Sequence, residues 1–136
     1  MKYKYFEHTA DVKFQAYGRS LDEAFENAAY ATTDIITDHN KVKQKVTKKI
    51  NVESEDKKAL LYDFLEEIIV LLDSEDFILS EIKNLKITDN ALIAELIGDT
   101  NPKNYDINMH IKAVTYQEME ITEDKDKVTL QVIIDI

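Results

Sequence analysis

The sequence predicts an α+β fold in a single domain, with two helices packed on mostly antiparallel sheets. Two stretches in the first half repeat apolar residues at helical spacing, whereas the second half holds only strand-like runs. Helices and strands therefore do not alternate as in a doubly wound fold, and the expected order is β-β-α-β-α-β-β-β-β. With 136 residues, of which 44% are hydrophobic, the chain can fill one core, so residues 1–136 are expected to form one domain.

Two strands are expected before the first helix. One runs from Lys2 to His8, and the second from Asp11 to Tyr17. Alternation places one apolar set on a single face of the second strand: Val12, Phe14 and Ala16. Gly18, one of only two glycines in the chain, ends this strand.

The first helix begins at a capping box. Ser20 and Glu23 have the spacing in which each side chain can accept a backbone N–H that the helix leaves unpaired. A buried stripe then follows at three- and four-residue steps: Leu21, Ala24, Phe25, Ala28, Thr32 and Ile35. We expect the helix to end near Thr37.

A third strand and the central helix come next. Apolar and polar residues alternate from Val46 to Val52, which indicates a strand. From Asp56 to Asp73 the apolar residues have helical spacing: Leu60, Leu61, Phe64, Leu65, Ile68, Ile69 and Leu72. This second helix should lie at the centre of the core.

Four strands should complete the fold. They are expected at 77–87, 91–97, 107–120 and 128–136, with turns at 88–90 and 123–126. Residues 112–120 should pair antiparallel with the final strand and show strict alternation, with Ala113, Thr115, Gln117 and Met119 on one face. The final strand is apolar on one face to its end: Val128, Leu130, Val132, Ile134 and Ile136. Its end should therefore be docked in the fold.

Composition excludes several functional classes. There is no cysteine, so disulfides, thiolate nucleophiles and iron–sulfur clusters are absent. The formal net charge of −10 repels phosphate backbones, which disfavours DNA as a partner and any broad RNA surface. The lysine-rich residues 41–49 are better explained as a protected strand edge than as an RNA patch. No apolar run approaches the roughly 20 residues of a membrane span, so we expect no membrane association and a cytoplasmic location.

The chain end carries charges that need compensation. Docking of the last strand would bring the Asp135 side chain and the Ile136 carboxylate into a partly desolvated place, and unpaired charge there is costly. Asp11 begins an N-terminal strand that could lie beside the C-terminal one. Converging oxygen ligands would select a hard cation, Ca²⁺ or Mg²⁺. The spacing alone leaves the alternative of solvated aspartates at strand ends, which is the more common arrangement.

The sequence offers few other residues or motifs for catalysis. His8, His39 and His110 form no paired metal-ligand motif, and neither a glycine-rich phosphate loop nor a G-x-S-x-G nucleophile motif is present. His39 follows the first helix, and we expect it to be a cation at the helix C-terminus. His110 is expected to be a surface residue on a strand. His8 lies three positions from Asp11, where a functional role and a structural hydrogen bond are both reasonable. An independent enzyme site is hard to build from these residues.

Motifs along the whole chain resemble the archease family. The matching segments are His8–Val12, Ala16–Gly18, Ser20–Ala29, Ala59–Glu75, Ile111–Tyr116 and Val132–Ile136. The resemblance implies an accessory protein that activates an RtcB-type RNA ligase in tRNA splicing, promoting its guanylylation and multiple turnover and broadening its nucleotide use. It implies no catalysis by the chain itself, and only indirect contact with tRNA.

The resemblance also implies a metal site. The family's ligands fall on Asp11, Asp135 and Ile136, the last through a backbone oxygen, and calcium is the expected ion with magnesium as the alternative. Two features depart from the family pattern: Gln117 stands where a histidine is usual, and a histidine is missing near Tyr105. Both departures leave the Asp11 and Asp135 positions themselves unchanged. Two rival functions remain, a stand-alone metal-dependent phosphoester or nucleotide hydrolase and a chaperone-like binding module with a structural ion.

Overall fold

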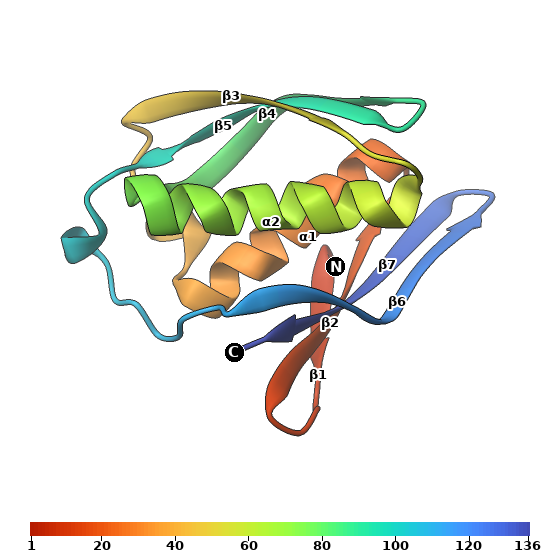
Figure 1. The fold of residues 1–136 in the computed structure, drawn as a ribbon, viewed down its shortest axis with the longest axis horizontal. Coiled ribbons are helices and arrows are strands. Elements are labelled where there is room, and N and C mark those ends of the chain that lie inside the picture. Colours follow the sequence, from red (N-terminus) through yellow and green to blue (C-terminus); the bar gives the residue numbers. More distant parts are fainter.

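A computed structural model describes residues 1–136 as seven strands and two long helices in three layers (Figure 1). The elements are β1 (Tyr3–Phe6), β2 (Asp11–Gly18), α1 (Leu21–Ile36), β3 (Val46–Glu53), α2 (Lys57–Glu75), β4 (Ile78–Thr88), β5 (Ala91–Asp99), β6 (Ala113–Asp124) and β7 (Lys127–Asp135). Short 3₁₀ turns occur at η1 (His39–Lys41) and η2 (Pro102–Asn104). The predicted order of strands and helices is confirmed.

Two antiparallel sheets enclose the helices. One sheet has the order β1-β2-β7-β6 and the other β3-β5-β4, and every neighbouring pair is antiparallel. Both helices lie between the two sheets, which Figure 1 shows with the three-stranded sheet above and the four-stranded sheet below. β3 is an edge strand, as the lysine-rich residues 41–49 predict. No helix combines the length and apolar character needed to cross a membrane.

Side-chain caps fix where the helices begin. The Ser20 hydroxyl accepts the Glu23 N–H at 3.2 Å, as the capping box predicts, but the Glu23 carboxylate accepts the N–H of Arg19 at 3.1 Å instead of that of Ser20. The Asp56 carboxylate caps α2 by accepting the Ala59 N–H at 2.8 Å. α2 runs two residues past its predicted end and stops at Asp76, whose φ of 57° is left-handed.

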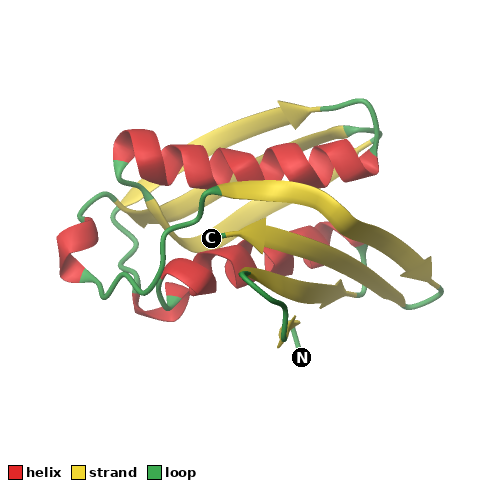
Figure 2. Cartoon of the chain, turned by 60° about the horizontal axis from the view of Figure 1, so that its bottom comes forward, coloured by secondary structure: helices red, strands yellow, loops and turns green.

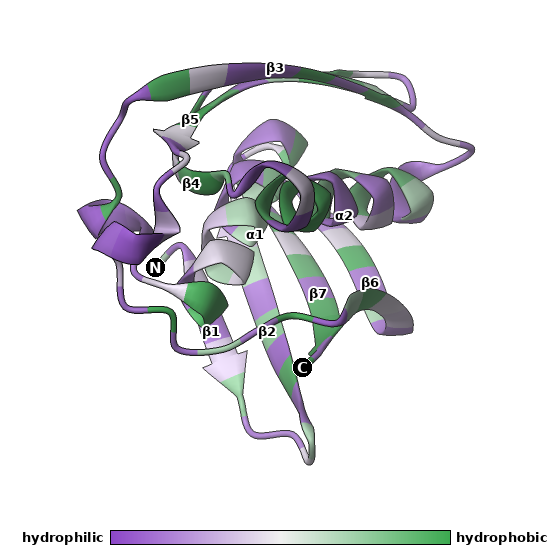
Figure 3. Cartoon of the chain, turned by 60° about the vertical axis from the view of Figure 1, so that its left-hand side comes forward, coloured by the Kyte–Doolittle hydropathy of each residue, from purple (hydrophilic) through white to green (hydrophobic).

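One core fills the space between the helices and both sheets. Its largest fully buried side chains include Phe14 of β2, Phe25 of α1 and Phe64 of α2. The inward face of β7 is buried as predicted, and Ile136 packs against it. Figure 3 shows the corresponding alternation of hydrophobic and hydrophilic residues along β2 and β7. Each such side chain contributes about 1.5–3 kcal/mol by burial, so the chain end is held in place by the core.

The predicted strand at 107–120 is wrong over its first part. Residues 106–110 form an exposed loop, drawn between η2 and β6 in Figure 2, and β6 begins only at Ala113. Ala113 stands opposite Asp135, the last residue of β7. Apart from the Lys112 N–H, which donates to the Asp135 main-chain oxygen, the residues before Ala113 therefore have no neighbouring strand to pair with.

β6 also departs from the predicted alternation. Thr115 pairs with Ile133 and Glu120 with Gln131, so residues 116–119 stand opposite the single residue Val132. Glu118 adopts a left-handed φ of 54° within this bulge. As a result Val114 and Met119, which strict alternation places on opposite faces, are both buried.

Candidate metal centre at the end of the four-stranded sheet

The pairing of β2 with β7 brings Asp11 directly opposite Asp135. Their neighbours Val12 and Ile134 form the next pair and face the core, so the two aspartates project from the other face of the sheet. Side chains that stand opposite each other in an antiparallel pair have Cβ atoms about 5 Å apart, where like charges repel. Two carboxylates therefore meet at the end of this strand pair.

His8 meets Asp11 from the turn between β1 and β2. Its Nδ1 contacts Oδ1 of Asp11, and its Nε2 lies 3.3 Å from Oε2 of Glu118 in the β6 bulge. Lys13 Nζ donates to the other Glu118 oxygen at 3.1 Å. These hydrogen bonds from Lys13 and His8 lower the pKa of Glu118. His8 thus bridges two carboxylates, only one of which has another cationic partner.

The two aspartates differ in their partners. Asp11 Oδ1 and His8 Nδ1 are buried and contact each other, and no other polar atom bonds to either. The Asp135 carboxylate makes no hydrogen bond or ion pair within the chain, although its main-chain oxygen accepts the Lys112 N–H at 2.8 Å. Unmet acceptors of this kind can be satisfied by a cation or by a donor on a partner.

The donors present fit a hard cation. Asp11 and Asp135 offer carboxylate oxygens, and Ile136 offers a main-chain oxygen at the end of β7. Calcium takes six to eight oxygen ligands, so these groups would fill only part of its shell. No third His, Asp or Glu ligand atom lies close enough to both aspartates to close the site. Residues that hold an ion here would leave positions for water or for a second molecule.

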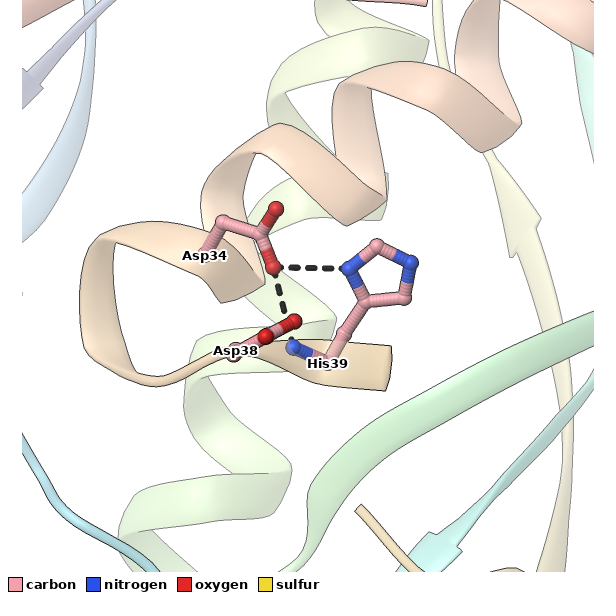
Figure 4. Close-up of side chains that lie close together, drawn as sticks. All are labelled: Asp34, Asp38 and His39. Carbon is pink, nitrogen blue, oxygen red and sulfur yellow. Dashed lines mark hydrogen bonds and ion pairs between the residues drawn. The ribbon is translucent and has the colours of Figure 1, made fainter. Parts of the chain in front are cut away.

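One other group, not predicted from the sequence, does bring three possible ligands within 4.8 Å of one another: Asp34, Asp38 and His39 (Figure 4). Asp34 Oδ1 accepts the His39 backbone N–H at 2.9 Å and lies 2.7 Å from His39 Nδ1, while Asp34 Oδ2 accepts the Tyr3 hydroxyl. Burial opposes ionisation of Asp34, but these hydrogen bonds outweigh it and lower its pKa. With both oxygens in use, the group ties β1 and η1 to the end of α1.

This arrangement corrects the interpretation of His39. The residue follows α1 as predicted, but it is buried, with its ring stacked on Tyr30 at a centroid distance of 4.5 Å. His39 is therefore a packed hydrogen-bonding residue and not a solvated cation at the helix end. His110 is exposed as predicted, but it lies in the 106–110 loop and not on a strand.

Tyr105 anchors the start of that loop. Its hydroxyl donates to Asp99 at 2.6 Å and accepts the Lys43 N–H at 3.0 Å. The hydrogen bond from Tyr105 lowers the pKa of Asp99. Tyr105 thus has a structural function in this part of the chain.

The candidate ion ligands lie outside the main hollows of the surface. None of the five main surface hollows is lined by His8, Asp11 or Asp135. The largest is lined instead by residues such as Arg19 and Glu23 at the opposite end of β2. The centre is therefore accessible to a large partner and has no enclosed substrate pocket beside it.

The fold and this centre define a small single-domain α+β protein with helices enclosed by two antiparallel sheets. A model of the Archease protein family (MTH1598/TM1083) matches residues 3–136, and the chain belongs to this family. It is 36% identical to the archease of Methanosarcina barkeri over 140 residues, covering 99% of this chain and 96% of that protein. It is 38% identical to the archease of Thermococcus kodakarensis over 129 residues, covering 92% and 91%.

Solved structures agree with this assignment. The solution structure of Methanobacterium thermoautotrophicum protein 1598 matches with a TM-score of 0.85 and 33% identity, covering 99% of both chains. A crystal structure from Thermotoga maritima, described as an archease and possible chaperone, matches with a TM-score of 0.61 over 98% of this chain and 96% of that one. At 20% identity the second match shows the shared fold alone. The resemblance found in the sequence motifs is confirmed.

Proposed function

We propose that this archease activates an RtcB-type RNA ligase in tRNA splicing, promoting guanylylation and multiple turnover of the ligase and broadening its nucleotide use. The observation that carries the proposal is the pairing of Asp11 with Asp135 on the outer face of the sheet, where His8 is the only side chain that contacts Asp11 and the Asp135 carboxylate has no partner within the chain. The chain acts as a cofactor protein and not as the catalyst. It meets tRNA only through the ligase, because its net charge of −10 repels phosphate.

Asp11, Asp135 and the Ile136 main chain would hold a calcium ion, or magnesium in its place. Such an ion supplies charge neutralisation and orientation of phosphate oxygens, which govern phosphoryl and nucleotidyl transfer. His8 orients the Asp11 carboxylate through its Nδ1, while Glu118 and Lys13 fix the far side of the imidazole. The open side of the centre leaves coordination positions for groups of the ligase.

Two rival functions make different predictions. A stand-alone hydrolase needs a pocket and a general base, and the open surface around His8 supports the accessory role over it. A chaperone-like module with a structural ion would lose thermal stability on chelation, yet would still activate the ligase once the fold was restored. Assays of the purified protein against nucleotides and phosphoesters address the first rival, and the variants below address the second.

The direct test is RNA ligation by the cognate ligase at substrate excess, with and without this protein. Asp11→Ala and Asp135→Ala should each abolish multiple turnover while circular dichroism shows an intact fold. Asp106→Ala, an exposed carboxylate in the 106–110 loop, serves as the matched control and should activate normally. Full activation by both folded site variants would refute the proposal.

A further inference from the structure

A pair of stacked tyrosines lies at the edge of the four-stranded sheet, apart from the ion ligands. Tyr62 of α2 and Tyr116 of β6 have ring centroids 4.4 Å apart and ring planes within 8° of parallel. Tyr116 is 55% exposed, more than any other large apolar side chain except Met1. An aromatic ring held rigidly in place and open to solvent is the kind of side chain that anchors protein interfaces.

Carboxylates surround this pair. Burial and the negative charges of Asp63, Asp56 and Glu55 raise the pKa of Tyr116, and burial with Glu66 and Asp63 raises that of Tyr62. The charged side chains that raise these two pKa values most are all carboxylates. We call Tyr62, Tyr116 and their four carboxylates Glu55, Asp56, Asp63 and Glu66 the tyrosine patch.

The chemistry of the tyrosine patch indicates which kind of partner can bind there. A guanidinium can stack on an exposed tyrosine face and pair with adjacent carboxylates, and Arg and Tyr are both enriched at the centres of interfaces. A nucleobase could also stack on Tyr116, but the carboxylates would repel the phosphates that accompany it. A basic protein segment is therefore the occupant that this surface fits.

The tyrosine patch lies close to the proposed metal centre. Tyr116 is three residues from Ala113, which stands opposite Asp135, so the two features are about 10 Å apart along the strand. β6 is the edge strand of its sheet, and its pairing with β7 is interrupted from residue 116 to residue 119. The aspartates project from one face of this sheet, and Tyr116 reaches towards α2 on the other. A molecule that covers the edge can contact both.

We infer that the tyrosine patch is a docking surface for an arginine-bearing basic segment of the ligase, which seats that protein beside the ion ligands. The inference rests on the proposed function for the identity of the partner. The chemistry of the surface rests on the residues of the patch alone.

The first test measures binding of the cognate ligase by isothermal titration calorimetry. Tyr116→Ala should weaken the affinity about tenfold or more, whereas Tyr116→Phe, which keeps the stacked ring, should bind as the wild type. Ile93→Ala is the matched control, because Ile93 is 52% exposed on β5 in the other sheet. Because Tyr116 is mostly exposed, melting temperatures should stay within a few degrees and confirm that the variants are folded.

Charge reversal provides a second, independent test of the inference. Glu66→Lys places a cation in the tyrosine patch and should weaken binding at least as much as Tyr116→Ala, with a smaller salt dependence. Asp106→Lys makes the same change in net charge at an exposed position in the 106–110 loop and should leave the affinity unchanged. Wild-type binding by both Tyr116→Ala and Glu66→Lys would overturn the inference while leaving the proposed function in place.

Two simple ligands test the chemistry of the tyrosine patch independently of the ligase. A deca-arginine peptide should bind the wild type and lose affinity about tenfold or more with Tyr116→Ala, whether or not the ligase binds. A ten-residue oligouridine should not bind. If the ligase fails to bind the wild type, the proposed function falls and the peptide decides the chemistry of the patch. Tyr116-dependent binding of oligouridine, or an unchanged affinity of Tyr116→Ala for the peptide, would overturn the inference.

Discussion

Replacement of Asp135 by asparagine should change the stability of the protein in opposite directions with and without calcium. In a chelator, Asp135→Asn removes one of two like charges whose Cβ atoms are about 5 Å apart. Coulomb's law gives a repulsion of about 0.8 to 3 kcal/mol at that separation, for effective dielectric constants of about 80 and 20. Both side chains are partly exposed and His8 offsets the Asp11 charge, so we expect about 1 kcal/mol of stabilisation.

In calcium, the wild type should instead be the more stable of the two proteins. At an ion concentration of about one hundred times Kd, binding to the folded state stabilises the wild type by about 2.7 kcal/mol. The asparagine variant offers one carboxylate in place of two and should gain much less. For a domain of this size, 1 kcal/mol corresponds to about 3–5 °C in Tm. Asp135→Asn should therefore melt about 3–5 °C above the wild type in chelator, and several degrees below it in calcium.

Thermal melts followed by circular dichroism, in EDTA and then in calcium, measure both effects on one sample. Asp106→Asn is the control for a general loss of one negative charge, since Asp106 lies in the exposed loop. The control should respond to calcium as the wild type does. A lower Tm of Asp135→Asn in EDTA, or an equal calcium gain in variant and wild type, would refute the reasoning about this site.

Two further predictions concern the fold. Because hydrogen bonds from His39 and Tyr3 lower the pKa of Asp34 despite its burial, the carboxylate stabilises the fold above its ordinary pKa of about 4, and this stability is lost as the pH falls through the lower, folded-state pKa. Urea unfolding between pH 6 and pH 2 should show the wild type losing stability more steeply below pH 4 than Asp34→Asn; equal slopes would contradict this. Gly98→Ala should cost about 3 kcal/mol or more, or about 10 °C in Tm, because its Cβ would lie 1.9 Å from the Ile78 carbonyl oxygen. An unchanged Tm would show that the strands adjust freely there.

The sequence predicts the elements well because their signals are local. Apolar residues recur at the helical period in α1 and α2, and Ser20 lies where its side chain caps the first turn. The alternating burial of β3 and of the inward face of β7 likewise follows from a two-residue period. Each of these patterns is complete within one element and needs no knowledge of its neighbours.

What the sequence does not predict depends on pairing between distant segments. Residues 106–110 have a strand-like composition but no strand opposite them, because β7 ends at Asp135. The β6 bulge changes which residues face inward, and nothing near Glu118 in the sequence indicates a left-handed residue. Ile133 is fully buried outside the main core, between Lys13 and Thr115 on the neighbouring strands. These outcomes follow from the strand register, which local patterns do not specify.

The residues of the candidate site fall into the same two groups, those that the sequence indicates and those that depend on the fold. Asp11, Asp135 and His8 stand out in the sequence by their position near the chain ends and by their place in recognisable motifs. Glu118 reaches both His8 and Lys13 only because the bulge turns Glu118 across the outer face of the sheet. The hydrogen bonds of Asp34 to His39 and Tyr3 also need the folded positions of three separate segments.

The pairing of β2 with β7 at the centre of its sheet also constrains how the protein is made. These strands come from opposite ends of the described chain, so loop-closure entropy delays their ladder until the intervening segments are in place. During synthesis β2 emerges from the ribosome long before β7, so β2 has no β7 to pair with until the end of synthesis. Because Asp11 and Asp135 lie in this late ladder, a half-made or misfolded copy would lack the proposed ion site, and only finished molecules would act on a partner through it.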